Sequence, residues 1–287
     1  MKKKTIVQYL LLPIILIFLL AGFYIINRNM AVNYPNPEPT HLIPLTANIE
    51  IPILMYHHIG TLPSKYNSIR KDLTVSREVF TDQVADIRAQ GFTSIKLEDI
   101  YLYATGQKNL PDKPIIFTFD DGYKDVFDNA LPTLESFGFT GTIAVITDFQ
   151  DQIIGDNVYG SWAQIRQAVA KGHEIVSHTH THFDALNKTY SNQVIIRDLS
   201  ESIKIIEQQT GLKTKILIYP YGHYSANYIQ LAKQSGFELG ITTKEGSLID
   251  LNNLMEIPRI RIHRNTTLNK LRTKLNQNNL GKSPTIK

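Results

Sequence analysis

The feature that most constrains the fold is a regular alternation of apolar segments of strand length with amphipathic segments of helix length. Seven apolar runs recur along the chain, at residues 51–56, 114–119, 142–146, 174–177, 215–219, 238–242 and 258–262. Between them, apolar residues spaced three and four apart predict helices at residues 79–89, 130–137, 163–170, 194–209 and 227–235. Each of these five stretches is followed closely by a glycine suited to a left-handed helix cap, namely Gly91, Gly138, Gly172, Gly211 and Gly236. The order predicts an α/β fold in which helices cover parallel strands.

Composition narrows the chemistry that this fold can carry. The chain has 287 residues, 43% of them hydrophobic and 20% charged, which is ordinary for a globular protein. It contains no cysteine. Disulfides, a thiolate nucleophile and a cysteine-ligated zinc site are therefore excluded, and a metal site must use His, Asp or Glu.

The charge distribution gives no support to nucleic-acid binding. Thirty Lys and Arg residues stand against 26 Asp and Glu, a formal net charge of +4. Part of this excess comes from lysines near the two ends of the chain, at residues 2–4 and 282–287. The body of the chain is nearly neutral, whereas a nucleic-acid-binding protein is expected to have a basic face.

The N-terminal segment predicts a membrane anchor. The basic end, residues 1–4, precedes a mostly apolar stretch within residues 5–26, which as a helix is about 30 Å long and spans a bilayer. Lysines stay in the cytoplasm, so the rest of the chain is expected outside the cell as part of a single-pass membrane protein. A cleaved signal peptide is the alternative and would give a secreted protein.

The remaining segments divide into a spacer, one domain and a tail. Residues 27–48 are rich in Asn, Pro and Thr and are expected to form an extended linker. Residues 49–275 are about as long as one α/β barrel or doubly wound domain. We expect residues 276–287 to form a flexible tail.

Polar residues gather where the predicted strands end, which is where parallel α/β folds place their chemistry. Asp120 and Asp121 follow the apolar run 114–119 and precede Gly122. Adjacent carboxylates repel one another, so a metal ion or a proton must lie between them if they are buried. The alternative is a turn in which an aspartate caps a helix.

Three histidines within five residues, His178, His180 and His182, follow the apolar run 174–177. Neutral imidazoles are strong ligands for zinc-like metals. His178 and His182 converge on one ion if the segment turns helically after the strand, and His178 paired with His180 is the alternative. This cluster predicts a metal site.

Together, the segments 117–123 (FTFDDGY) and 172–182 (GHEIVSHTHTH) resemble the first two motifs of the polysaccharide deacetylase family, also called the NodB-homology or carbohydrate esterase 4 family. The resemblance extends to residues 219–222 (YPYG) and covers roughly residues 50–265. It implies a deformed (β/α)7 barrel with parallel strands and outer helices. It also implies a metal-dependent hydrolase that removes acetyl groups from N-acetylated glycans.

The resemblance implies a role for each matching residue. Asp121, His178 and His182 correspond to the metal ligands and Asp120 to the general base. The backbone N–H of Tyr221 corresponds to the donor that stabilises the oxyanion. His58 and His180 are expected to have structural roles or to support the ligands.

Two departures from the usual family pattern bear on the general acid and the substrate. The Arg-x-Pro motif is absent, with Ile218 in place of the arginine, and the Asp-x-x-Asp-Trp motif is also missing. These departures resemble the subgroup that deacetylates poly-β-1,6-N-acetylglucosamine of biofilm. In that subgroup an early Tyr-His element, matched here by residues 54–58 (LMYHH), supplies the acid. The resemblance thus indicates His57 as the acid, with His263 as the alternative, and Arg259 as a partner of Asp120.

The leading hypothesis is a membrane-anchored N-deacetylase that acts on a surface glycan. A peptidoglycan or chitooligosaccharide deacetylase would use the same residues. A hypothesis of another class is an inactive glycan-binding module, against which the second carboxylate, Asp120, argues. The ligands favour a divalent metal, with Zn²⁺ as the first choice, but Co, Ni, Mn and Fe accept the same side chains.

Overall fold

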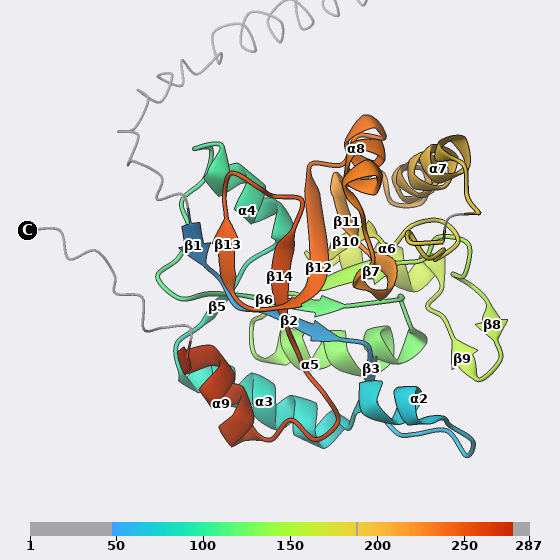
Figure 1. Ribbon diagram of the computed structural model, residues 1–287. Coiled ribbons are helices and arrows are strands. Elements are labelled where there is room, and N and C mark those ends of the chain that lie inside the picture. The colour runs from blue at the N-terminus through green and yellow to red at the C-terminus, as the bar shows by residue number, and fades with distance from the viewer. Residues whose placement is uncertain (1–47, 188, 278–287) are drawn as a thin grey trace, which may run out of the picture. The chain divides into compact units, whose positions relative to one another are not determined.

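The computed structural model describes residues 48–187 and 189–277, and its centre is a closed barrel of seven parallel strands (Figure 1). The strands follow one another around the barrel in chain order, and β2 pairs with both β14 and β6, which closes it. They are β2 (Ile53–Tyr56), β6 (Pro114–Phe119), β7 (Thr142–Val145), β10 (Glu174–Ser177), β11 (Ile216–Ile218), β12 (Leu239–Glu245) and β14 (Ile257–Arg261). Each corresponds to one predicted apolar run, so the prediction of a deformed (β/α)7 barrel is confirmed.

The barrel is irregular on the side of β10, β11, β12 and β14. A single pair of facing residues, Ser177 and Leu217, joins β10 to β11. The register between β12 and β14 shifts between Ile241 and Glu245. These two irregularities are the deformation of the barrel.

The predicted helices are present with small changes at their ends. They are α3 (Arg77–Ala89), α5 (Leu131–Ser136), α6 (Trp162–Ala170), α7 (Asn192–Thr210) and α8 (Ala226–Gln234). A π-helical turn, η1 (Val126–Ala130), leads into α5. The five glycines predicted to follow these helices all have a positive φ, as expected of left-handed caps.

Several further elements were not predicted from the sequence. The helices among them are α2 (Ser68–Leu73), α4 (Leu97–Ala104), α9 (Leu268–Gln277) and the 3₁₀ turn η2 (Pro220–Gly222). The strands are β1 (Asn48–Glu50), β3 (His58–Ile59), β4 (Thr74–Val75), β5 (Thr93–Ser94), β8 (Ile153–Ile154), β9 (Asn157–Val158) and β13 (Leu248–Asp250). β5 extends the barrel sheet beside β6, while β1–β13, β3–β4 and β8–β9 form separate pairs.

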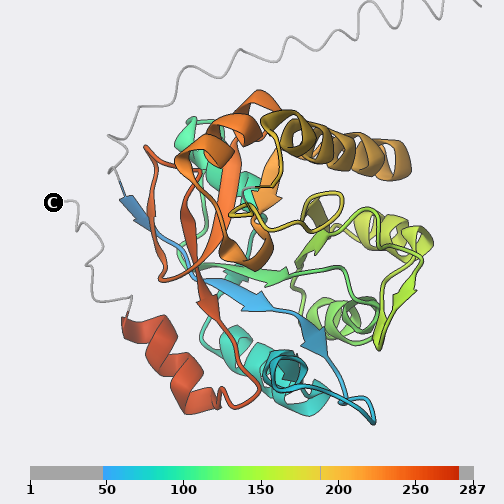
Figure 2. The ribbon, with the colours of Figure 1, turned by 45° about the vertical axis from the view of Figure 1, so that its right-hand side comes forward.

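Three groups of buried side chains hold the layers together. One fills the barrel with alternate strand residues such as Ile53, Ile116 and Ile241. A second packs α3, α5, α6 and α9 against the outer face of the strands, and a third lies under α7 and α8. Figures 1 and 2 show α3 and α9 on one side of the strands and α7 with α8 on the other. Alternate residues of each strand thus serve two cores, which is why the strands are continuously apolar.

The predictions for the two ends of the chain mostly concern residues outside the part that the structure describes. The basic end 1–4, the membrane anchor 5–26 and the linker 27–48 lie outside the described residues, apart from Asn48, which begins β1. Within residues 48–187 and 189–277, no helix is long and apolar enough to cross a membrane. α9 includes the first two residues of the predicted tail, and residues 278–287 lie outside the description.

Candidate active site

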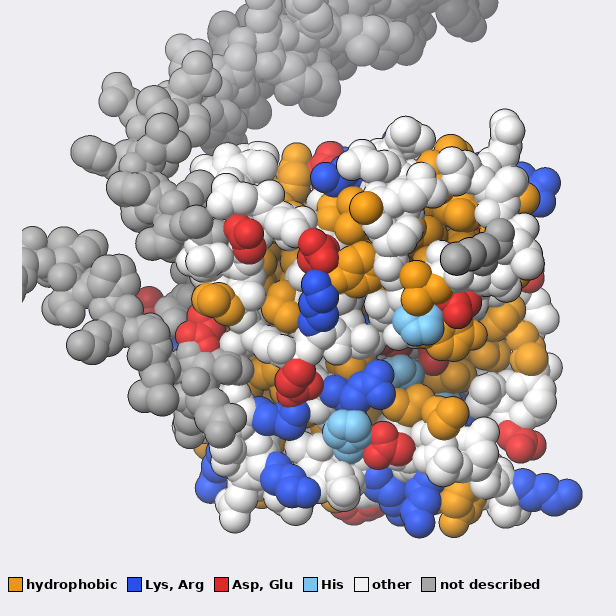
Figure 3. All heavy atoms as spheres, in the orientation of Figure 1, with side chains coloured by type: hydrophobic (Ala, Val, Ile, Leu, Met, Phe, Trp, Pro, Cys, Tyr) orange, Lys and Arg blue, Asp and Glu red, His pale blue; other side chains and the backbone are white. Residues whose placement is uncertain are grey.

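A cavity of about 500 Å³ lies at the carboxyl ends of the barrel strands. Six of the predicted site residues line it: His57, Asp120, Asp121, His178, His182 and Tyr221. In the view of Figure 3, histidine and carboxylate side chains are partly sunk in a hollow of the surface, with basic and apolar side chains around it. Residues from four different strand ends therefore meet in one place, as expected for a parallel barrel.

Asp121, His178 and His182 form the one group of metal-binding type within residues 48–187 and 189–277. Asp121 Oδ1 lies 3.3 Å from His178 Nε2 and 3.4 Å from His182 Nε2. Ligand atoms that are about 2.1 Å from a tetrahedral ion are about 3.4 Å from one another. The two distances from Asp121 thus match ligands of one ion, all three donors lie within 4.8 Å of one another, and further coordination positions stay open.

The tautomer of His178 suits this role. Its Nδ1 lies 2.7 Å from the carbonyl oxygen of Ile218, so Nδ1–H donates to that carbonyl. Nε2 then faces Asp121, to which it donates when protonated, and it can offer its lone pair to a metal once that proton is lost. A fixed hydrogen bond on the far nitrogen is the usual way in which proteins orient a metal-binding histidine.

Burial and neighbouring charges set the protonation states of the group. Burial opposes ionisation of Asp121, but the hydrogen bond and charge of His178 outweigh it and hold the pKa of that carboxyl far below its usual range. Burial, with repulsion from His178, lowers the pKa of His182 to about 4. At neutral pH Asp121 is therefore a carboxylate and His182 a neutral imidazole, the forms that bind metals. Burial opposes the charged form of His178, but its hydrogen bond to Asp121 outweighs this and raises the pKa of His178, so a metal that binds there displaces a proton.

The backbone is strained around these side chains. Four of the five residues other than glycine with positive φ in the described part of the chain are Asp121 (74°), Thr179 (68°), His182 (57°) and Tyr221 (59°). Such conformations are uncommon for residues with a Cβ and gather at functional sites. The strain supports a functional role for these turns.

Asp120 lies beside the group and is bound by Arg259, as the sequence indicated. Arg259 is fully buried beneath the cavity and donates from Nη1 to Asp120 Oδ1 (2.7 Å) and from Nη2 to Oδ2 (2.8 Å). It also donates to Thr118 Oγ1 and to the carbonyl of Thr242. Burial opposes ionisation of Asp120, but Arg259 outweighs it and holds the pKa of Asp120 below its usual value.

His57, which follows β2, faces the same carboxylate. Its Nε2 lies 4.0 Å from Asp120 Oδ2. Burial lowers the pKa of His57, against the attraction of Asp120 and Asp121, so the protonated ring is a stronger acid than a free histidine. His57 therefore stands where a proton can pass between it and a group bound at the cavity.

The alternative acid, His263, lies behind a lining residue of the cavity, Asp72. Its Nδ1 is paired with Asp72 at 2.7 Å, and it does not line the cavity. His58 is buried and pairs with Asp125 at 2.9 Å, and His180 contacts Thr147. These contacts place His57, rather than His263, beside Asp120.

Two supporting residues, Tyr123 and Asp198, were not among the predicted site residues. Tyr123 stacks on His58, with ring centroids 3.6 Å apart, and lines the cavity next to Asp121. Asp198, on α7, binds the loop that carries the histidines. A signal for Asp198 was present, because it is a carboxylate on the otherwise mostly apolar buried face of a predicted helix.

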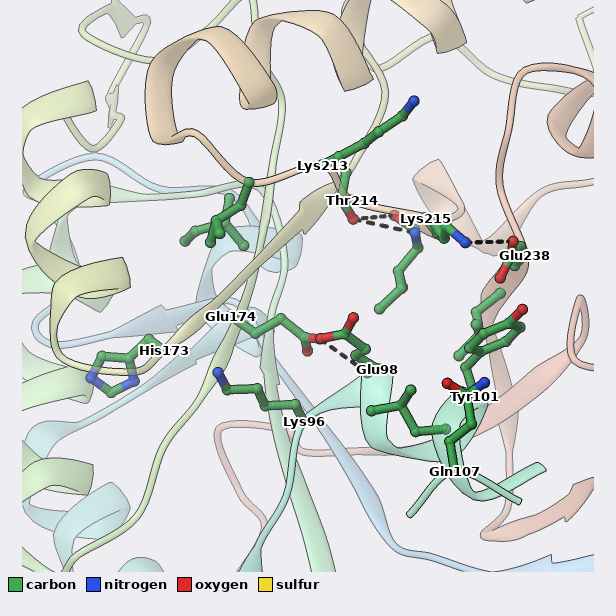
Figure 4. A pocket seen from close by; sticks show the side chains of 15 residues that line it. Lys96, Glu98, Tyr101, Gln107, His173, Glu174, Lys213, Thr214, Lys215 and Glu238 are labelled. Atoms are coloured by element: carbon green, nitrogen blue, oxygen red, sulfur yellow. Dashed lines mark hydrogen bonds and ion pairs between the residues drawn. The ribbon is translucent and has the colours of Figure 1, made fainter. Parts of the chain in front are cut away.

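A second cavity, of about 460 Å³, lies at the amino ends of the strands (Figure 4). Its charged groups are largely used in structural contacts. Glu174 accepts hydrogen bonds from the first backbone N–H groups of α4, at Leu97 and Glu98, and Lys215 pairs with Glu238 at 2.8 Å. This end of a barrel ordinarily serves stability, and we do not assign it the chemistry.

Comparison with known proteins agrees with the geometry. The family model described as "Polysaccharide deacetylase" matches residues 107–240, which include Asp120, Asp121 and both ligand histidines. The chain thus contains a polysaccharide deacetylase domain, as the sequence motifs predicted. It is therefore an amide hydrolase, a polysaccharide N-deacetylase.

The individual relatives have low sequence identity to this chain, but the matches cover most of it. YxkH of Bacillus subtilis (strain 168), named for the polysaccharide deacetylases, is 28% identical over 213 residues, 74% of this chain and 71% of the relative. The poly-β-1,6-N-acetyl-D-glucosamine N-deacetylase of Escherichia coli O157:H7 is 25% identical over 68% of this chain, but the match spans only 34% of that longer protein. The solved structure of the Streptococcus pyogenes deacetylase PplD in complex with acetate is 26% identical, with a TM-score of 0.70 over 79% of this chain and 98% of the other.

Proposed function

We propose that this deacetylase removes acetyl groups from N-acetylglucosamine units of poly-β-1,6-N-acetylglucosamine and that a divalent metal, Zn²⁺ in the first place, is held by Asp121, His178 and His182. The observation that carries the reaction is the meeting of this ligand group with the Arg259-bound Asp120 and with His57 in one cavity. A second carboxylate and a second imidazole beside the ligands are the acid–base groups that amide hydrolysis requires.

Each side chain has a chemical task in this proposal. When bound, the metal lowers the pKa of a water molecule and polarises the acetyl carbonyl. Asp120, kept ionised by Arg259, accepts the proton of the attacking water. The backbone N–H of Tyr221 donates to the oxyanion, and His57 protonates the departing sugar amine.

The choice of glycan rests on two observations. The E. coli relative carries the name of a poly-β-1,6-N-acetylglucosamine deacetylase. This chain also has a histidine next to Tyr56, at the end of β2, that faces Asp120. At 25% identity these observations favour the β-1,6 polymer, and peptidoglycan or chitooligosaccharides are the competing outcomes of the test.

The test is acetate release by the full-length chain from β-1,6-linked and β-1,4-linked N-acetylglucosamine oligomers, with Zn²⁺ or another divalent metal added. We expect release from the β-1,6 oligomers, its loss in Asp120→Asn and its loss on chelation. Preference for the β-1,4 oligomers would instead indicate peptidoglycan or chitin as the substrate. Failure to release acetate from either oligomer with any metal would refute the proposal.

We also propose that residues 5–26 anchor the chain in the cell membrane, with the catalytic domain outside. The support is the apolar segment behind three lysines. Protease treatment of intact cells should digest the domain, and the full-length chain should remain with the membrane fraction after a carbonate wash. Release of a shortened chain into the medium would instead indicate a cleaved signal.

A further inference from the structure

The loop that carries both histidine ligands is attached to helix α7 by one buried carboxylate. Asp198 Oδ2 accepts from the backbone N–H of His180 at 3.0 Å. Its Oδ1 accepts from the N–H of Thr181 at 3.1 Å and from the Thr181 hydroxyl at 2.7 Å. The two anchored residues, His180 and Thr181, lie between Thr179 and the metal ligand His182.

The other hydrogen bonds of the anchored segment do not reach the N–H groups of His180 and Thr181. Thr179 and His182 both have positive φ, so the turn is intrinsically unfavourable. The His182 N–H donates to Thr179 Oγ1 at 2.9 Å, a bond within the turn itself. From neighbouring elements, the loop receives hydrogen bonds from the N–H groups of Thr147 and Asp148, and the His180 ring contacts the Thr147 hydroxyl. Asp198 is the acceptor that reaches both central N–H groups.

The contact between Asp198 of α7 and the loop lowers the stability of the fold, because it requires a buried charge on the helix. Its buried face consists of Ile195, Asp198, Leu199, Ser202, Ile203 and Ile206. An apolar residue at position 198 would pack without desolvating a charge, whereas the carboxylate, 8% exposed, must be compensated by hydrogen bonds. Ser202, one turn further along, contacts Ser177 Oγ at 2.7 Å, directly before the first ligand. Both polar residues of this face therefore contact the segment from residue 177 to residue 181.

We propose that Asp198 is a positioning residue for metal binding, which fixes the turn between His178 and His182 so that their Nε2 atoms stand at ligand spacing before the metal arrives. The inference rests on the proposed metal site. A turn that is already ordered loses less conformational entropy on binding, so the carboxylate raises metal affinity without touching the metal.

The test is Zn²⁺ affinity of the full-length chain in mild detergent, measured by competition with a chromogenic chelator. Asp198→Asn keeps the size of the side chain but offers one acceptor oxygen in place of two. We expect Zn²⁺ to bind about tenfold more weakly or worse. Glu201→Gln is the matched control, because it removes the same charge from the exposed face of the same helix, and its affinity should equal that of the original chain.

Amide hydrogen exchange supplies a readout that a general loss of stability would not give. In Asp198→Asn, exchange should accelerate at His180 and Thr181 in the metal-free protein while the strands of the barrel keep their protection. Thr181→Val removes one of the three hydrogen bonds and should weaken Zn²⁺ binding by less than Asp198→Asn does.

The outcomes separate this inference from the proposed function. If the original chain binds Zn²⁺ and Asp198→Asn binds it equally well, the positioning role is refuted while the metal site stands. If Asp198→Asn does not fold, Thr181→Val decides, and an unchanged affinity there overturns the inference. If the original chain binds no divalent metal, the metal site itself is wrong and the inference falls with it.

Discussion

Replacing Arg259 by methionine should destabilise the barrel far more than an ordinary surface substitution does. The guanidinium is fully buried and donates four hydrogen bonds, two of them to Asp120. Asp120 is itself only 3% exposed. Arg259→Met would leave that carboxylate buried without a counter-charge, a loss of about 3–5 kcal/mol in the free energy of unfolding. For a domain of this size, that loss lowers Tm by roughly 6–20 °C.

The assay is urea unfolding of the full-length chain in EDTA, so that differences in metal binding do not contribute to the measured free energy. Arg259→Met, Asp120→Asn and the double variant complete a double-mutant cycle. Because the double variant removes both charges, it should lose less stability than the sum of the single variants, with a coupling energy of about 1.5 kcal/mol or more. Arg261→Met is the matched control, since that arginine lies two residues further along β14 and is partly exposed.

Two results would refute this reasoning. One is an additive cycle, in which the double variant loses the sum of the two single losses within about 0.5 kcal/mol. The other is a loss in Arg259→Met no larger than that in Arg261→Met. Either would mean that water or a rearranged neighbour compensates Asp120, and that Arg259 does not hold its charge.

Three further predictions follow from the same geometry. His57→Gln should lower kcat by about 10²- to 10⁴-fold with Zn²⁺ affinity unchanged, and an equal loss of affinity would argue against an acid role. Gly222→Ala should lower kcat/KM, because its φ is +74° and a Cβ would lie 2.0 Å from Thr243 Oγ1; Gly138→Ala, with open space around it, is the control. Burial lowers the pKa of His173 below the usual histidine value of 6.5, against the attraction of Glu135. The folded state therefore binds this proton less readily than the unfolded chain, so stability should fall as the pH drops below about 6.5, and His173→Gln should flatten that slope in urea titrations.

The barrel could be predicted because its strands are buried on both faces. Each strand must then be apolar throughout, and the seven runs stand out against the amphipathic helices between them. The short strands gave no such signal. β5, β8 and β9 have two residues each and are largely exposed, so nothing in their composition separates them from a loop.

Part of the site could be predicted as well, because its position follows from the fold. Chemistry at the strand ends follows from the topology of a parallel barrel, and this led to Asp120, Asp121 and the histidine cluster. The pairing of Arg259 with Asp120 joins residues 139 positions apart and was indicated only by resemblance to a family. No local pattern in the sequence specifies which buried arginine faces which buried aspartate.

The partners of the residues that shape the turns could not be predicted from the sequence, because these partners are backbone groups. Asp198 accepts from the N–H groups of His180 and Thr181, which every residue other than proline would provide, so the partner leaves no trace in the sequence. Only the misplaced polarity on α7 marks it. A buried carboxylate on an apolar helix face must have a compensating partner, and in a barrel whose strand ends carry chemistry the nearest uncompensated N–H groups are those of the strained turns. A polar residue on the buried face of a covering helix therefore indicates that the helix holds a loop at the strand ends in place by hydrogen bonds.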